Sequence, residues 1–255
     1  MKKKTLRKMR YNQSISKAYK AAMDKIIKEA GESANYWATA QYNDNMSKGR
    51  TIKEAAERIA ALKSDWVTNF SDVSFTVASR FAHSVDKSTK KAINSSLSES
   101  GIAKVKFAMT PAMKEAIDGV VAENVSLIKS IPEQYFTQVE NIAIESITRG
   151  RDLNYMTTEL QKQLGVTKRR AERIALDQNN KATAKLTKIR DEEMGITKGI
   201  WIHSGGGSNP RQKHVAANGK EFSLSKGLQV GDNGEWVLPG EEINCGCSWK
   251  PILPY

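Results

Sequence analysis

The sequence predicts a mainly helical protein that ends in a small α+β module. Apolar residues recur at helical spacing through residues 51–194, and capping signals interrupt them. After Gly195 the pattern changes to short β-like runs separated by glycine and Asn-Gly turn signals. Both cysteines and two of the three histidines lie between Trp201 and Cys247. We therefore expect the helices to form a scaffold and the C-terminal module to carry the specific chemistry.

The composition is that of a globular protein with a basic surface. Of the 255 residues, 39% are apolar, which is enough to bury a core. The formal net charge of +12 favours a polyanionic partner, with nucleic acid ahead of a membrane surface. No apolar run approaches the roughly 18 residues that span a bilayer. The basic start lacks the apolar stretch of a secretory signal, so we expect a cytosolic protein with reduced cysteines.

Breaks in the helical pattern, rich in serine and glycine, predict three regions. Residues 1–100 are expected to be a helical region with a basic arm, and residues 101–196 a second helical part. Residues 197–255 form the small module. The first boundary falls in the serine-rich stretch that contains Gly101.

Individual elements are predicted from caps, breakers and periodicity. Helix starts are expected at the Thr51–Glu54 capping box, at Asp72, at Pro111, at Ser130–Glu133, at Asn154 and at Thr167. Gly165 is expected to end the short helix that begins at Asn154. Short strands are predicted over residues 199–203, 220–224, 235–238 and 247–250, and their tryptophans Trp201, Trp236 and Trp249 are expected in the core of the sheet.

Two groups of basic residues are candidates for contacts with nucleic acid. One is in the N-terminal arm and the other is at the start of the last long helix. Either group is a solvated helix face, with a frayed terminus in the case of the arm, or a clamp on phosphates that ignores base sequence. The candidates are Lys2, Lys3, Lys4, Arg7, Lys8, Arg10, Arg169, Arg170 and Arg173.

Several separate pieces of the C-terminal half occur in an order that resembles one known family. They are Glu123–Ile128, Ile131-Pro132, Tyr135, Gly150, Arg170–Ala175, Gln178, Gly195-Ile196, Trp201, His214, Asn218-Gly219, Pro239-Gly240 and Cys245–Cys247. Over residues 115–250 the chain resembles the tailed-phage head morphogenesis family, the Mu F-like minor head proteins. The N-terminal half is merely compatible with the family.

The resemblance implies a minor capsid protein inside the virion head, associated with the portal vertex and made in the host cytoplasm. Such a protein acts in head assembly or in DNA packaging or delivery. The implied partners are the portal protein, the major capsid or scaffold protein, and double-stranded DNA bound without sequence specificity. No membrane partner and no enzymatic activity are expected.

The histidines and cysteines of the module are candidate metal ligands. Cys245 and Cys247 point to the same side of an extended strand, because residues i and i+2 do so. With His203 and His214 they would complete a tetrahedral, structural zinc site. The alternatives are a reduced pair of packed thiols, with His214 hydrogen-bonded to a turn, and, least favoured in a reduced compartment, a disulfide.

Two further hypotheses concern the loop before His214. Backbone amides of Gly205, Gly206 and Gly207, together with Arg211, are a candidate anion-binding turn. Alternatively, the loop belongs to a metal-dependent nuclease in which His214 and Asn218 act on a phosphodiester. The nuclease is less favoured because no pair of carboxylates in the module stands at ligand spacing from a histidine.

Overall fold

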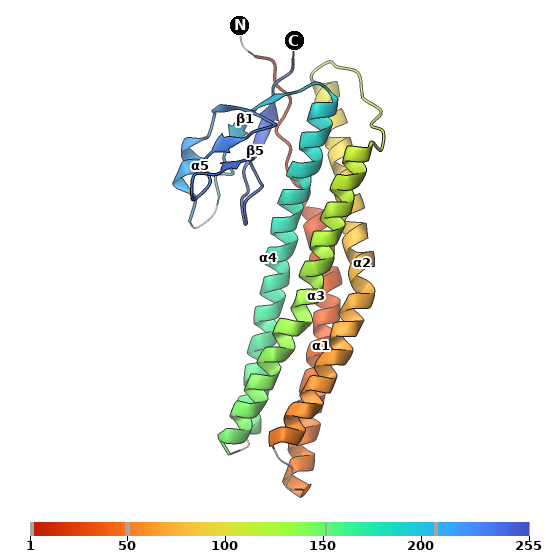
Figure 1. Cartoon of the computed structure of the whole chain (residues 1–255), viewed down its shortest axis with the longest axis vertical. Helices are drawn as coiled ribbons and strands as arrows, with labels where there is room; N and C mark the ends of the chain where they lie inside the picture. The colour runs from red at the N-terminus through yellow and green to blue at the C-terminus, as the bar shows by residue number, and fades with distance from the viewer. Residues whose placement is uncertain (1–2, 49–51, 151, 207–208, 255) are drawn as a thin grey trace. The chain divides into compact units, whose positions relative to one another are not determined.

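The computed structural model describes residues 3–48, 52–150, 152–206 and 209–254. Four long helices precede a set of short antiparallel strands (Figure 1). This confirms the predicted class, mainly α with a small C-terminal α+β module. The elements are α1 (Gln13–Lys48), α2 (Ile52–Glu99), α3 (Pro111–Thr148), α4 (Leu153–Glu193), β1 (Lys198–Ile202), α5 (Gln212–Ala216), β2 (Glu221–Ser223), β3 (Leu228–Gln229), β4 (Trp236–Val237) and β5 (Ser248–Pro251).

The long helices continue through three sites at which the sequence predicts that a helix begins or ends. Asp72 lies inside α2, Pro132 inside α3 and Gly165 inside α4, so the predicted interruptions are wrong. Proline removes a backbone hydrogen bond, and glycine costs about 1 kcal/mol relative to alanine in a helix. Apolar burial continues across these positions, as Ile131 and Tyr135 show on either side of Pro132. Packing therefore outweighs the local signals.

The chain folds into two compact units, each assembled from stretches that are separate in sequence. The first contains Met1–Ser16, Arg80–Val121 and Leu176–Tyr255, and the second contains Lys17–Ser79 and Ala122–Ala175. Each long helix contributes residues to both units. The division into residues 1–100, 101–196 and 197–255 stays a prediction about the sequence.

The regular elements of the second unit are all helices in its described residues. Its core includes Met23, Ile27, Phe70, Ile128 and Phe136, each no more than 2% exposed. A buried hydrogen bond also joins α1 to α3, because the Tyr19 hydroxyl donates to Oδ1 of Asn124 at 2.8 Å. This unit has the character of a scaffold.

The first unit contains the sheet. Its three strands are antiparallel in the order β2-β1-β5, and β3 pairs with β4 in a separate two-stranded ribbon. Trp201 of β1 lies opposite Trp249 of β5, and both are buried, as predicted. Trp236 is not in the core: it is 48% exposed, and the ammonium group of Lys226 lies 3.8 Å from its ring centroid.

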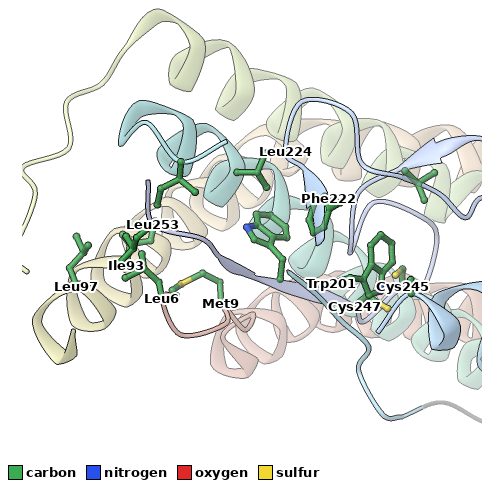
Figure 2. Packing of buried hydrophobic residues seen from close by; sticks show 14 residues of the cluster. Leu6, Met9, Ile93, Leu97, Trp201, Phe222, Leu224, Cys245, Cys247 and Leu253 are labelled. Atoms are coloured by element: carbon green, nitrogen blue, oxygen red, sulfur yellow. The ribbon is translucent and has the colours of Figure 1, made fainter. Parts of the chain in front are cut away.

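The N-terminal arm is an extended segment beside the C-terminal segment of the chain, not a frayed helix (Figure 1). The Leu6 amide donates to the Pro251 carbonyl at 2.9 Å, and the Leu253 amide donates to the Lys4 carbonyl at 3.0 Å. Leu6 and Met9 are buried in the same apolar cluster as Ile93 and Leu97 of α2 (Figure 2). Apolar residues spaced three apart therefore anchor the arm to the first unit.

Two ionisable side chains are buried in the first unit near the end of α4. Arg190 is fully buried and forms an ion pair with Asp86 of α2. Asp191 is also fully buried, and its carboxylate accepts a hydrogen bond from Nε1 of Trp249 at 2.9 Å. Burial raises the pKa of Asp191 to about 8, although the Trp249 hydrogen bond opposes this shift. The strands are therefore joined to α4 by polar contacts as well as apolar ones.

None of the helices described in the structure is both long enough and apolar enough to cross a membrane.

Candidate metal centre

His214 lies on α5, a helix of only five residues, and two backbone hydrogen bonds join the turn that follows this helix to β1. The Gly219 amide donates to the Trp201 carbonyl, and the Trp201 amide donates to the Lys220 carbonyl, both at 2.8 Å. Gly219 has a φ of +83°, which the predicted Asn-Gly turn requires. His214 is consequently held with its ring 5.2 Å from the Trp201 ring, in an edge-to-face arrangement.

The two cysteines lie on a loop that approaches α4 closely. Gly240 has a φ of +87°, and a Cβ at this position would lie only 3.2 Å from the Cβ of Ala184. The Asn244 amide donates to Oδ1 of Asp177 on α4, and Asn244 itself has a φ of 58°. Glycine at position 240 and the Asp177 carboxylate thus fix the path of the loop before Cys245.

His214, Cys245 and Cys247 form a compact buried group. Nδ1 of His214 lies 3.5 Å from Sγ of Cys245 and 3.7 Å from Sγ of Cys247. The candidate ligand atoms of the three residues all lie within 4.8 Å of one another. The three residues are 2%, 3% and 8% exposed, so the group is enclosed. Figure 2 shows the two cysteines at the same end of the apolar cluster as Trp201.

Both cysteines are free thiols, and their contact separates their acidities. The hydrogen bond between them lowers the pKa of Cys245 and raises the pKa of Cys247. Burial opposes the first shift and adds to the second. One proton shared between two sulfurs is the expected state without a cation, since two adjacent buried thiolates repel each other. A divalent cation would favour the loss of both protons.

Glu242 approaches the other side of the imidazole ring. Its Oε2 lies 2.8 Å from Nε2 of His214 and 3.5 Å from Nε of Arg211. Although the first distance is short, both atoms lack an aligned hydrogen bond, so the N–H direction misses the oxygen. The sequence prediction missed this residue. Its only signal was a carboxylate three residues before Cys245, which gives no indication of a histidine 28 positions away.

His203 is not part of the group, although the sequence predicts it as the fourth ligand. It lies just after β1, where the chain turns at Gly205 with a φ of +74°. Its Nδ1 accepts a hydrogen bond from the Gly205 amide at 3.1 Å. Among the described residues, no other His, Cys, Asp or Glu joins His214 and the cysteines within ligand distance of one another.

The predicted anion-binding turn is occupied by contacts within the chain. The Gly205 amide donates to His203, and the Gly206 amide lies 3.4 Å from Oγ of Ser204. The Arg211 guanidinium faces the carboxylates of Glu242 and Asp232. Gly207 lies outside the described residues. The described part of the turn therefore has few donors left for an external anion.

The predicted basic residues fall into two groups. Engaged cations have a carboxylate or hydroxyl partner within the chain, and available cations have no ion-pair partner among the described residues. Lys3 pairs with Glu221, Arg7 pairs with Glu99 at 2.9 Å, and the Arg170 guanidinium donates to the Ser130 hydroxyl at 2.9 Å. Lys2 lies outside the described residues. For the remaining candidates, the described residues supply no ion-pair partner. These are Lys4, Lys8, Arg10, Arg169 and Arg173.

Two of the available cations line one cavity in the first unit. Lys8 and Arg10 border a space of about 620 Å³, together with Asn180, Thr187 and Cys247. The hydroxyl of Thr187 is buried and lacks a hydrogen-bond partner. Lys8 and Arg10 of the arm and Cys247 of the cysteine loop thus line the same cavity.

The C-terminal part of the chain matches a known protein family. Residues 137–250 match the model of a family described as Phage Mu protein F like protein. An uncharacterized protein of Haemophilus influenzae is 35% identical over 145 residues. The alignment covers 56% of this chain but 31% of the relative, so the chain spans about a third of the length of that protein. No solved structure matches the chain.

Proposed function

The C-terminal part of this chain, residues 137–250, belongs to the phage Mu F-like family, and on this premise we propose that the protein is a minor head protein associated with the portal. The family match is the single observation that carries the proposal. The matched segment contains the whole candidate metal centre and all of α4, so the family match covers the module and the helix that precedes it. The role proposed for this module is attachment during head assembly, without catalytic turnover.

The position of the chain in a particle tests this proposal. We expect mass spectrometry of purified virions to find the chain in fewer copies than the major capsid protein. Cryo-electron microscopy of the same particles should place it at the portal vertex, on the inner side of the head. Its absence from full and empty heads alike, or an even distribution over the shell, would contradict the proposal.

Contacts with DNA are proposed to be electrostatic and blind to base sequence. The net charge of +12 and the available cations support this, because a protein inside a head meets phosphates on every side. Each phosphate neutralised steepens the dependence of affinity on salt by about 0.9 in the logarithmic plot. Engaged cations contribute less, since their own carboxylates already compensate them.

We therefore expect the double variant Lys8→Gln/Arg10→Gln to bind duplex DNA more weakly and to lower the salt slope by up to about 2. Fluorescence anisotropy with a random-sequence duplex across a sodium chloride series measures both quantities. The matched control is Lys3→Gln/Arg7→Gln, in which the cations removed are already paired, and its slope should change less. Wild-type affinity that is indifferent to salt would refute the proposed contacts. Plasmid nicking with added magnesium, manganese or zinc that disappears in His214→Ala would support the nuclease alternative.

The cluster of His214, Cys245 and Cys247 is proposed to hold a structural zinc ion. Zinc binds sulfur at about 2.3 Å and nitrogen at about 2.0–2.1 Å, so tetrahedral ligands of these types lie about 3.6 Å apart. The observed Nδ1–Sγ distances of 3.5 and 3.7 Å match this spacing. Three protein ligands leave one position for solvent, as in catalytic sites, but the burial of all three favours a structural role.

Elemental analysis tests the zinc proposal directly. We expect about one zinc ion per purified wild-type chain and its loss in Cys245→Ser or Cys247→Ser, because a hydroxyl is a poor replacement for a thiolate. The control is His203→Ala, which removes a histidine of the same module that lies outside the cluster and should leave the zinc content unchanged. A metal-free wild-type chain, purified without chelators, would refute the proposal.

A further inference from the structure

The imidazole of His214 has two faces with different neighbours. Nδ1 faces two sulfur atoms, and Nε2 faces the carboxylate of Glu242 at 2.8 Å. A neutral imidazole carries its proton on one nitrogen only, and a zinc ligand must present the unprotonated one. The position of the proton on this ring therefore decides whether the cluster can bind a cation.

We propose that Glu242 is the outer partner of the metal centre, a positioning residue that keeps the His214 proton on Nε2. This inference rests on the zinc proposal and extends it to a residue that does not touch the metal. A carboxylate accepts a hydrogen bond from Nε2–H but offers no proton to Nδ1. The lone pair of Nδ1 is thereby directed between Cys245 and Cys247. Metal-bound histidines commonly donate their second N–H to a carboxylate in this way.

The missing hydrogen bond between Nε2 of His214 and Oε2 of Glu242 supports this inference. Nε2 of His214 and Oε2 of Glu242 are both buried, and both lack an aligned hydrogen bond despite their separation of 2.8 Å. Such a pair is uncommon in a finished protein interior. A cation held by Nδ1 would restrict the tilt of the ring, and a small rotation would then align Nε2–H with the carboxylate. Binding of a cation would thus complete the hydrogen bond between Nε2–H of His214 and Oε2 of Glu242, which already lie 2.8 Å apart.

Arg211 and the backbone hold Glu242 in this position. Nε of Arg211 lies 3.5 Å from the same Oε2, and Nη2 of Arg211 donates to the Ile243 carbonyl at 3.2 Å. The Cys245 amide donates to the Glu242 carbonyl at 3.0 Å, so Glu242 and Cys245 belong to one turn. Arg211 therefore acts within the metal centre and compensates the carboxylate charge.

Zinc affinity of Glu242 variants tests the inference. In competition with a chromophoric chelator, Glu242→Ala should bind zinc about 10- to 100-fold more weakly than wild type. Glu242→Gln keeps an acceptor oxygen and should recover part of that loss. The matched control is Asp232→Asn, which removes the other carboxylate facing Arg211 but does not contact His214. Its affinity should equal that of the wild type.

Cobalt substitution separates positioning from a loss of folding. All variants should show cobalt–thiolate charge-transfer bands at saturating cobalt, because the three ligands remain. Glu242→Ala should need the highest cobalt concentration for half-saturation, and Glu242→Gln an intermediate one. Zinc affinity of Glu242→Ala within twofold of wild type would overturn this inference and leave the zinc proposal standing. A wild-type chain that binds no zinc would overturn both, and neither result bears on the position in the virion.

Discussion

Replacing Asp86 with alanine should destabilise the protein by about 3–5 kcal/mol. The change leaves the guanidinium of Arg190, which is fully buried, without its carboxylate. Nε and Nη1 of Arg190 already lack hydrogen-bond partners, and its Cζ lies 4.7 Å from the centroid of the Phe107 ring. An uncompensated buried charge is among the most costly single defects in a protein interior. Urea denaturation followed by circular dichroism measures the effect.

Two further variants distinguish a buried charge from the loss of any ion pair. Asp118→Ala removes an exposed i,i+4 pair with Lys114 and should cost less than about 1 kcal/mol. The double variant Asp86→Ala/Arg190→Met removes both buried charges and should be more stable than Asp86→Ala alone. If Asp86→Ala and Asp118→Ala lower the midpoint equally, the ion pair of Asp86 and Arg190 has no special role.

Replacing Trp201 with alanine should also cost about 3–5 kcal/mol. Trp201 is fully buried at the centre of the sheet, with the rings of His214 and Phe222 5.2 and 5.9 Å away. The substitution leaves a cavity beside the cysteines, which the short strands cannot collapse to fill. We therefore expect a lower urea midpoint and a lower zinc content in the same variant.

The control for Trp201 is another tryptophan of the same module. Trp236 is 48% exposed, and Trp236→Ala should cost only about 0.5–1 kcal/mol through the lost contact with Lys226. Thermal denaturation of both variants gives the comparison. Equal losses would show that the sheet does not depend on the buried indole.

Local sequence signals predicted the composition of the fold but not the lengths of its helices. The change of period after Gly195 located the module, and four of its five strands lie where alternation and turn residues indicated. Pro132 and Gly165 misled the prediction, because local breakers act on a helix only when burial on either side does not outweigh them. The prediction that Trp236 lies in the core of the sheet was also wrong, since alternation alone does not reveal which face of a two-residue strand is covered.

The sequence by itself determined the class of the fold, the match of residues 137–250 to the Mu F-like family model and the i, i+2 spacing of the two cysteines. These depend on periodicity, residue order and i, i+2 spacing, all of which are local. Only the tertiary structure decided which histidine meets the thiols, because His203 and His214 are equally plausible until α5 is fastened to β1. It also brought Glu242 to the far side of the ring and the N-terminal arm to Pro251. Contacts between residues tens or hundreds of positions apart are set by how the elements pack, and no spacing in the chain encodes them directly.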